Sequence, residues 1–354
     1  MSTTEIFAKP KTASQSTTKP RIQFIDLAKG ICILLVLIDH CGIQTGVWIN
    51  HLRMPLYFIL SGLFYKDYGS FMELVRKKTN NLIIPFITFY GIGLLYAFSI
   101  DVICHNDLAS YAISVPEFLH DGPINNYALW FLLVLFWSNL LFWGISSIIR
   151  QEWLRAVIIL SLAYLSTFVN ADTGRSYVYI GSVLMNLPFF YTGYILKRTN
   201  ILYDKKSTPA PIWGGGIMLI ISLLATICIP LGYIRFANAV MPGNQILHYA
   251  ICILNVFGLL LICKKILWLP LISYIGRFSI IILVTHPMII GISEVFFRRV
   301  ISNVSLGTRP FAILFSSIII SIILIPVCRR YFPKVTAQTE FFSKKHPYNR
   351  LKQA

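Results

Sequence analysis

Ten separated apolar segments run through this chain of 354 residues, and they constrain its fold more than any other feature. A transmembrane helix needs about 20 predominantly apolar residues, and most of the segments approach that length. Charged residues make up only 13% of the chain, whereas a soluble domain contains about 25%. The sequence therefore predicts an all-α, polytopic membrane bundle of about ten transmembrane helices. The predicted spans are 22–41, 52–65, 82–103, 128–149, 154–170, 179–196, 212–231, 246–263, 271–292 and 311–328.

The basic residues are distributed unevenly between the two sets of connections that join these segments. The N-terminal tail and every second connection after it, including the C-terminal tail, contain 23 lysines and arginines, and the opposite set contains 6. Basic residues are enriched in cytoplasmic connections, so both termini are predicted to be cytoplasmic and the number of spans to be even. The formal net charge of +17 is then a topology signal and needs no nucleic-acid partner. An alternative is that the basic C-terminal tail contacts anionic lipid or a partner.

The polarity of the chain divides it into three parts. Residues 1–20 are rich in serine, threonine and lysine, which is typical of a polar cytoplasmic tail and not of a cleavable signal peptide. Residues 21–330 form one membrane domain, and residues 331–354 form a basic cytoplasmic tail. The cysteines lack the spacing of a metal site, so no bound metal is predicted.

The first predicted span contains four ionisable side chains. An ionisable group near the centre of a bilayer costs about 2.5–3.5 kcal/mol or more, so several on one helix indicate a function. At about 100° per residue, Lys29 lies roughly 20° from His40 around the helix, and Asp26 lies roughly 40° from it. These three side chains form a polar stripe that we expect to face protein or water. Asp39 lies about 100° away from His40 and could orient a neighbour or be an interfacial polar residue.

Two histidines are expected at a similar depth near the outer face. His40 ends the first span, and His286 lies in the outer half of a later span that begins near Arg277. An imidazole can take a proton from a hydroxyl group and return one to a leaving group. The alternative for His40 is an interfacial histidine bonded to backbone. We interpret His105, His120, His248 and His346 as loop or interfacial residues, and the aromatic residues, Trp143 among them, as membrane-belt or packing residues.

Arg53 opens the second predicted span, where it could stabilise an oxyanion or bind an anionic acceptor; the alternative is an exposed loop arginine. Pro55 suits the first turn of a helix. Ser61 and the glycine that follows it would allow close approach of another helix. The span is short, so it could tilt, break or re-enter the membrane.

Three adjacent cations, Arg76, Lys77 and Lys78, precede the third span on a predicted cytoplasmic loop. Such a cluster suits phosphate groups or a nucleotide. Anchoring by the positive-inside rule explains it as well.

These motifs together resemble the acyltransferase-three family of membrane acyltransferases, which includes bacterial O-acetyltransferases of surface sugars. The resemblance covers essentially residues 21–290. It rests on Asp-Leu-Ala-Lys-Gly at 26–30 with His40, Met-Pro-Leu-Tyr-Phe at 54–58 with Ser-Gly at 61–62, the basic cluster before Leu-Ile-Ile-Pro at 82–85, Leu-Trp-Phe-Leu at 129–132, and His286-Pro287.

The resemblance implies ten membrane helices, a cytoplasmic acyl-CoA donor and an essential histidine at His40. The basic residue eleven positions before it is Lys29, and Arg53 stands where a histidine is common in the family. Asn81 stands where a basic residue is frequent, so the contacts to the donor would rest on the cluster at 76–78.

The sequence as a whole favours an O-acyltransferase, most simply an O-acetyltransferase, of the bacterial cytoplasmic (inner) membrane. It would transfer the acyl group of acetyl-CoA or another acyl-CoA to a surface polysaccharide or lipid-linked sugar, with no permanently bound cofactor. His40 would act as general base, and Arg53 or His286 would stabilise the oxyanion. The chain lacks a recognisable serine nucleophile motif, which favours direct transfer. One alternative is a transporter or flippase for a polar lipid-linked glycan. Another is a regulatory membrane protein without catalysis.

Overall fold

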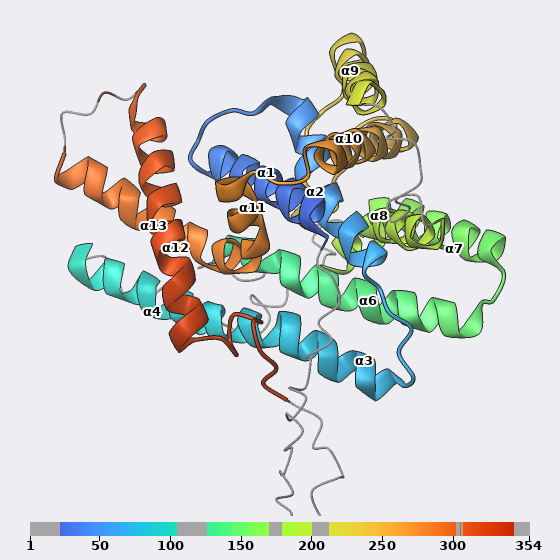
Figure 1. Ribbon diagram of the computed structural model, residues 1–354, viewed down its shortest axis with the longest axis horizontal. Coiled ribbons are helices and arrows are strands. Elements are labelled where there is room, and N and C mark those ends of the chain that lie inside the picture. The colour runs from blue at the N-terminus through green and yellow to red at the C-terminus, as the bar shows by residue number, and fades with distance from the viewer. Residues whose placement is uncertain are drawn as a thin grey trace, which may run out of the picture.

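The computed structural model describes residues 22–104, 126–169, 179–199, 212–301, 305 and 307–342. Within these residues the regular elements are helices, arranged as a bundle (Figure 1). The α-helices are α1 (Gln23–His40), α2 (Gly46–Leu63), α3 (Phe71–Lys78), α4 (Ile84–Cys104), α6 (Trp130–Ile148), α7 (Glu152–Leu165), α8 (Ile180–Arg198), α9 (Ile212–Cys228), α10 (Gln245–Ile266), α11 (Pro270–Arg277), α12 (Ser279–Arg299) and α13 (Arg309–Tyr331). Four short elements join them: the π-helix η1 (Thr79–Ile83) and the 3₁₀ turns η3 (Tyr127–Leu129), η4 (Ser166–Phe168) and η6 (Phe236–Asn238).

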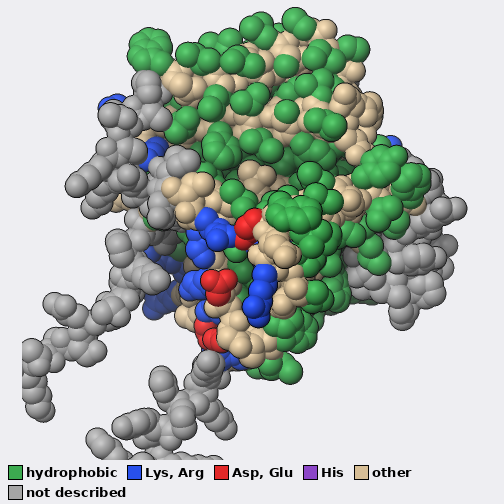
Figure 2. Space-filling model, turned by 90° about the vertical axis from the view of Figure 1, so that its right-hand side faces the viewer, with side chains coloured by type: hydrophobic (Ala, Val, Ile, Leu, Met, Phe, Trp, Pro, Cys, Tyr) green, Lys and Arg blue, Asp and Glu red, His purple; other side chains and the backbone are tan. Residues whose placement is uncertain are grey.

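The helices have the lengths and compositions of a multi-pass membrane protein. Five of the described helices are long and apolar enough to cross a bilayer, and a shorter apolar helix spans Ile212–Cys228. Much of the surface in Figure 2 is hydrophobic, and most of the charged side chains visible there gather in its lower part. The prediction of an all-helical membrane protein is therefore confirmed. Each of the ten predicted spans contains a helix, and ten crossings and cytoplasmic termini stay predictions.

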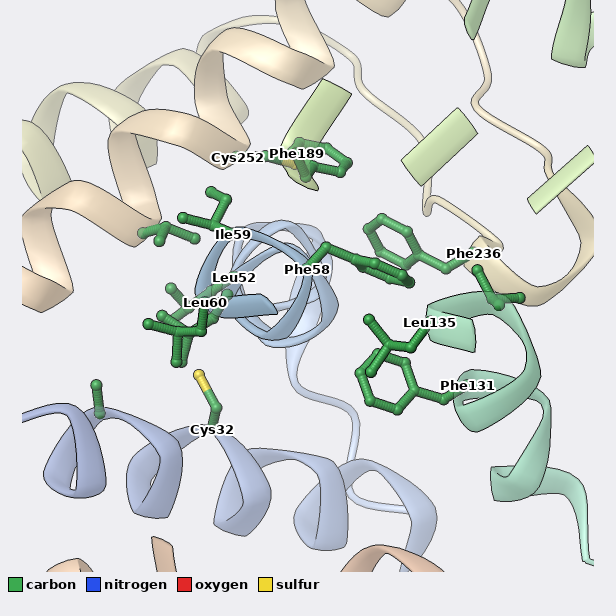
Figure 3. Close-up of a cluster of buried hydrophobic side chains, with 14 of the residues drawn as sticks. Cys32, Leu52, Phe58, Ile59, Leu60, Phe131, Leu135, Phe189, Phe236 and Cys252 are labelled. Atoms are coloured by element: carbon green, nitrogen blue, oxygen red, sulfur yellow. The ribbon is translucent and has the colours of Figure 1, made fainter. Parts of the chain in front are cut away.

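The core of the bundle surrounds α2, which lies between α1, α6, α8 and α10 (Figure 3). Phe58 of α2 is fully buried, and its ring packs edge-on against Phe131 of α6 at 5.2 Å between centroids. The sequence predicted a short second span at 52–65, possibly broken. The structure instead has an uninterrupted helix that begins at Gly46 and contains Pro55 in its interior.

Two glycines bring α2 and α8 into direct backbone contact. A Cβ added to Gly62 would lie 1.8 Å from the carbonyl oxygen of Phe190, and one added to Gly193 would lie 1.8 Å from that of Ile59. No side chain fits in either place. This close approach matches the role predicted for the Ser61–Gly62 pair, and it fixes the position of α2.

The segment predicted as one span at 271–292 is two helices. α11 ends at Arg277, the backbone breaks at Phe278, and α12 begins at Ser279. Arg277 therefore closes a short helix that packs against α1, and the prediction that it opens the span was wrong. The guanidinium carbon of Arg277 lies 5.2 Å from the Phe278 ring centroid, a contact of cation–π type.

The basic residues before the third span lie on a helix and not on a loop. α3, η1 and α4 follow one another without a break from Phe71 to Cys104. The side chain of Ser70 caps α3 by accepting a hydrogen bond from the Glu73 amide at 3.2 Å. Helical structure directs the three neighbouring cations toward different surroundings.

Candidate active site

Three rings from three elements meet where α1 ends. The imidazoles of His40 and His286 are stacked, with centroids 5.2 Å apart and planes 29° from parallel. The Tyr127 ring of η3 lies 4.8 Å from that of His40. His40 is exposed and His286 is completely buried. The structure thus brings together the two histidines that the sequence placed at one depth.

The hydrogen bonding of His286 defines its tautomer. Its Nδ1 lies 3.0 Å from the carbonyl oxygen of Ile282, and because a carbonyl only accepts, Nδ1 donates. Nε2 of the neutral ring then has a lone pair. This atom is buried and has no hydrogen-bond partner among the described residues. Nε2 of His286 can therefore accept a proton or a hydrogen bond, and no donor among the described residues occupies it.

Asp39 and Arg53 form a second part of the site. Nη1 of Arg53 donates to Oδ2 of Asp39 at 2.5 Å, and Thr45 donates to Oδ1 of the same carboxylate at 3.1 Å. Arg53 is only 7% exposed, so it is neither the loop residue considered from the sequence nor the start of its helix. The ion pair compensates part of the cost of burying its charge. Nε of Arg53 is buried without a partner among the described residues and is an available N–H donor.

The other members of the polar stripe lie nearer the beginning of α1. Asp26 is buried beside α11, where Gly276 approaches its backbone carbonyl. Nζ of Lys29 lies 5.6 Å from the Phe64 ring centroid at the end of α2. The hydroxyl of Tyr57 donates to the Lys29 carbonyl at 3.0 Å. The stripe therefore leads from the end of α2 toward His40.

The cations of α3 have separate surroundings. Lys77 is paired with Glu340, and this hydrogen bond lowers the pKa of the glutamate carboxyl. Lys78 lies over the Tyr68 ring, 6.0 Å from its centroid. Nη1 of Arg76 is buried with no partner within the described ranges. Of the three cations, the structure engages Lys77 in an ion pair within the protein.

A segment after α13 provides that contact. The side-chain oxygen of Asn80 in η1 accepts from the amides of Phe341 and Phe342, and its nitrogen donates to the Phe342 carbonyl at 3.0 Å. Asn80 is 1% exposed. Residues 332–342 therefore fold back against the basic helix.

Several residues of the site and its support escaped the sequence-based prediction. Tyr127 was missed, although it lies two residues before the Leu129–Leu132 motif. It follows Asn126, which donates to the Val284 carbonyl at 3.0 Å. The prediction that His248 is a loop or interfacial residue was wrong. It is fully buried in α10 and contacts His51, a residue to which no role was assigned.

Comparison with known proteins assigns the chain to a family. A family model described as an acyltransferase domain, that of the acyltransferase-three family, matches residues 22–327. The search of curated proteins and the search of solved structures each found no match. The matched range extends from α1 into α13 and includes every site residue described above. The chain therefore belongs to the acyltransferase-three family and is a multi-pass membrane acyltransferase.

Proposed function

We propose that this membrane acyltransferase is an O-acyltransferase, most simply an O-acetyltransferase, of the bacterial cytoplasmic membrane. Its donor is cytoplasmic acetyl-CoA or another acyl-CoA, and its acceptor is a hydroxyl group of a surface polysaccharide or lipid-linked sugar. The observation that carries this proposal is the exposed His40 ring stacked on the buried His286 ring. An exposed imidazole held in place by a buried one is accessible to a substrate and restricted in orientation.

The reaction needs one group that moves a proton twice. His40 takes the proton of the acceptor hydroxyl as its oxygen attacks the thioester carbonyl carbon. The carbon–sulfur bond then breaks, and His40 returns the proton to the coenzyme A thiolate. The products are an ester and free coenzyme A thiol, so the transfer needs no oxidant, metal or retained cofactor.

Arg53 is the better placed of the two groups considered for the oxyanion. The neutral His286 ring uses its N–H toward Ile282, so its Nε2 has no hydrogen to donate. Arg53 has an unpartnered Nε–H, and its charge is held by Asp39, the neighbour of His40 in the chain. A preorganised donor in a site shielded from water stabilises a developing oxyanion strongly. In this assignment His286 positions the His40 ring.

The donor reaches His40 along the polar stripe. By the positive-inside rule, the basic residues of α3 are cytoplasmic and His40 lies near the outer face. Lys29 lies between them, about 16 Å from His40 along the helix axis at 1.5 Å per residue. The extended arm of coenzyme A can run beside such a stripe with its nucleotide at the cytoplasmic end. Asp26 would orient the beginning of this path.

The test is mass spectrometry of glycans from cells that express the wild type, His40→Ala, Arg298→Ala or an empty vector. Arg298 is a matched control because it forms an exposed ion pair with Glu294 at the end of α12. We expect one added acyl group with the wild type and Arg298→Ala, and none with His40→Ala. An equal gain from His40→Ala would refute its role as base. Movement of a glycan across the membrane without any new ester would favour the transporter.

A further inference from the structure

A small aromatic cavity lies at the end of the bundle where α2, α6 and α8 approach α3. Four rings line it, those of Tyr65, Tyr68, Trp143 and Tyr194. Its volume is about 160 Å³, below the roughly 300–1,000 Å³ that a complete drug-sized ligand occupies. The cavity therefore suits a single ring system and not a whole cofactor or an oligosaccharide. Trp143, interpreted from the sequence as a belt or packing residue, is half-buried at its wall.

The walls of the cavity are packed against neighbouring side chains. The Tyr65 ring packs edge-on against Phe142 at 5.0 Å between centroids, and the Trp143 ring lies 5.1 Å from Phe71. Lys197 donates to the Tyr65 carbonyl at 2.6 Å, which joins the end of α2 to the end of α8. A preformed aromatic cavity loses little conformational freedom when a flat ring enters it.

Two cations lie beside rings that line the cavity. Nζ of Lys78 lies 6.0 Å from the Tyr68 ring centroid. The guanidinium carbon of the exposed Arg198 lies 5.8 Å from the Tyr194 ring centroid, and this side chain also pairs with Glu152. Figure 2 views this end of the bundle, where lysine and arginine side chains gather with a few carboxylates. The charge and the spread of these cations suit phosphate groups attached to the ring in the cavity.

Two polar groups of the lining are available to a ligand. Oγ of Ser146 is buried and has no hydrogen-bond partner among the described residues. The Asp67 side chain is exposed at the rim and offers a carboxylate acceptor. A ring nitrogen can accept from Ser146, and an exocyclic amine can donate to Asp67. Adenine has both groups and a flat face for stacking on the aromatic walls.

We propose that this cavity binds the adenine ring of the coenzyme A donor, with its phosphates held by Lys78 and Arg198. The proposal rests on the proposed function, because that function supplies the donor. The position supports it further: Tyr65 of the cavity directly follows Phe64, whose ring contacts Lys29 of the polar stripe. When the nucleotide is bound in this cavity, the arm of coenzyme A that carries the thioester extends past Lys29 toward His40.

The test measures binding of coenzyme A, and of adenosine 3′,5′-bisphosphate alone, to the full-length protein in lipid nanodiscs. The decisive variant is Trp143→Ala. Trp137→Ala is its matched control, since Trp137 lies on the same helix with its side chain facing outward, 41% exposed. We expect both ligands to bind Trp143→Ala roughly 5- to 150-fold more weakly, the loss expected for one base–aromatic stacking contact. Phosphopantetheine, which has no nucleotide, should bind both variants as it binds the wild type.

A second variant avoids any change in packing. Asp67→Ala removes the acceptor from an exposed loop residue, so the fold stays intact. This variant should lose the preference of the wild type for coenzyme A over an analogue with hypoxanthine in place of adenine, because hypoxanthine lacks the exocyclic amine. Equal binding of both bases to wild type and variant would overturn the assignment.

The remaining outcomes separate the two proposals. If Trp143→Ala binds coenzyme A like the wild type and acyl transfer persists, the cavity is not the nucleotide site and the proposed function stands. If a glycan fragment and not a nucleotide competes for the cavity, the inference is refuted in favour of an acceptor site. If the wild type neither binds coenzyme A nor transfers an acyl group, both proposals fail.

Discussion

His51 in α2 and His248 in α10 contact each other through their ring nitrogens, although 197 residues separate them in the chain. Nε2 of His51 lies 2.6 Å from Nδ1 of His248, and the two rings are stacked at 4.8 Å between centroids. Their outer nitrogens lie 2.7 Å from the Val47 carbonyl and 2.5 Å from the Pro242 carbonyl. Both side chains are fully buried. This contact joins α2 to α10 only two residues from Arg53.

We predict that His51 and His248 contribute to stability as a unit. Each single alanine substitution should lower the free energy of unfolding by about 1–3 kcal/mol, because it leaves a buried partner unsatisfied. The double substitution should cost less than the sum, with a coupling of about 0.5–3 kcal/mol. Unfolding in detergent with the full double-mutant cycle measures this, and Tyr164→Ala, an exposed position on α7, is the control. If the two losses in the free energy of unfolding were strictly additive, the contact between the two rings would contribute nothing to stability.

The substitution Arg53→Lys should distinguish the effect of the positive charge at residue 53 from the effect of its Nε–H donor. Lysine keeps the positive charge beside Asp39 and removes the unpartnered Nε–H that we assign to the oxyanion. The expected result is a fall in kcat of roughly 10²–10³-fold with little change in KM, the usual effect of losing an oxyanion donor. Arg298→Lys serves as control. A rise in KM at unchanged kcat would instead place Arg53 in substrate binding.

Gly62→Ala should disrupt the contact between α2 and α8. The new methyl group would lie 1.8 Å from the Phe190 carbonyl oxygen, so the helices must separate and the core around α2 must loosen. A thermal unfolding assay should show a large loss of stability. The matched control is Gly144→Ala in α6, where an added Cβ meets no atom within 4 Å, and alanine is the better helix former by about 1 kcal/mol. Equal stability of the two variants would contradict the close contact.

The attachment of residues 332–342 to α3 should depend on pH. Lys77 lowers the pKa of Glu340 below its ordinary value of 4.5. A lowered pKa in the folded state adds stability that is complete above the ordinary value and is lost as the pH falls through the lowered one. Hydrogen exchange of this segment should therefore increase below about pH 4.5, and Glu340→Gln should exchange faster at neutral pH. Protection unaffected by both changes would assign the attachment to Asn80 alone.

The sequence was sufficient to predict the class of fold, because the thickness of the bilayer sets the length of the apolar segments that cross it. It was less informative where tertiary packing decides. The break at Phe278 follows Gly276 and Arg277, which the prediction of a single span at 271–292 did not treat as an interruption. α2 begins at Gly46, where the residues are of mixed polarity. Contacts with distant helices hold that start, such as the hydrogen bond from Trp48 to Ser222 of α9, and a local pattern does not record them.

The candidate site was predictable in part for a similar reason. His40 and His286 share a depth that follows from span boundaries, so their proximity could be anticipated. The pairing of Arg53 with Asp39 depends on the angle at which α2 enters the bundle, and that of His51 with His248 on a contact between distant helices. Neither contact produces a residue spacing that can be recognised in the sequence. The aromatic cavity likewise collects residues from two helices and a loop.

The central claim is that His40 acts as general base in the direct transfer of an acyl group from coenzyme A inside the cell to an acceptor hydroxyl near the outer face. Right-side-out membrane vesicles loaded with labelled acetyl-CoA, with the acceptor glycan supplied outside, test it most directly. The account predicts labelled glycan with the wild type and none with His40→Asn. Labelling by His40→Asn at the wild-type rate, or labelling that requires acetyl-CoA outside the vesicles, would contradict it.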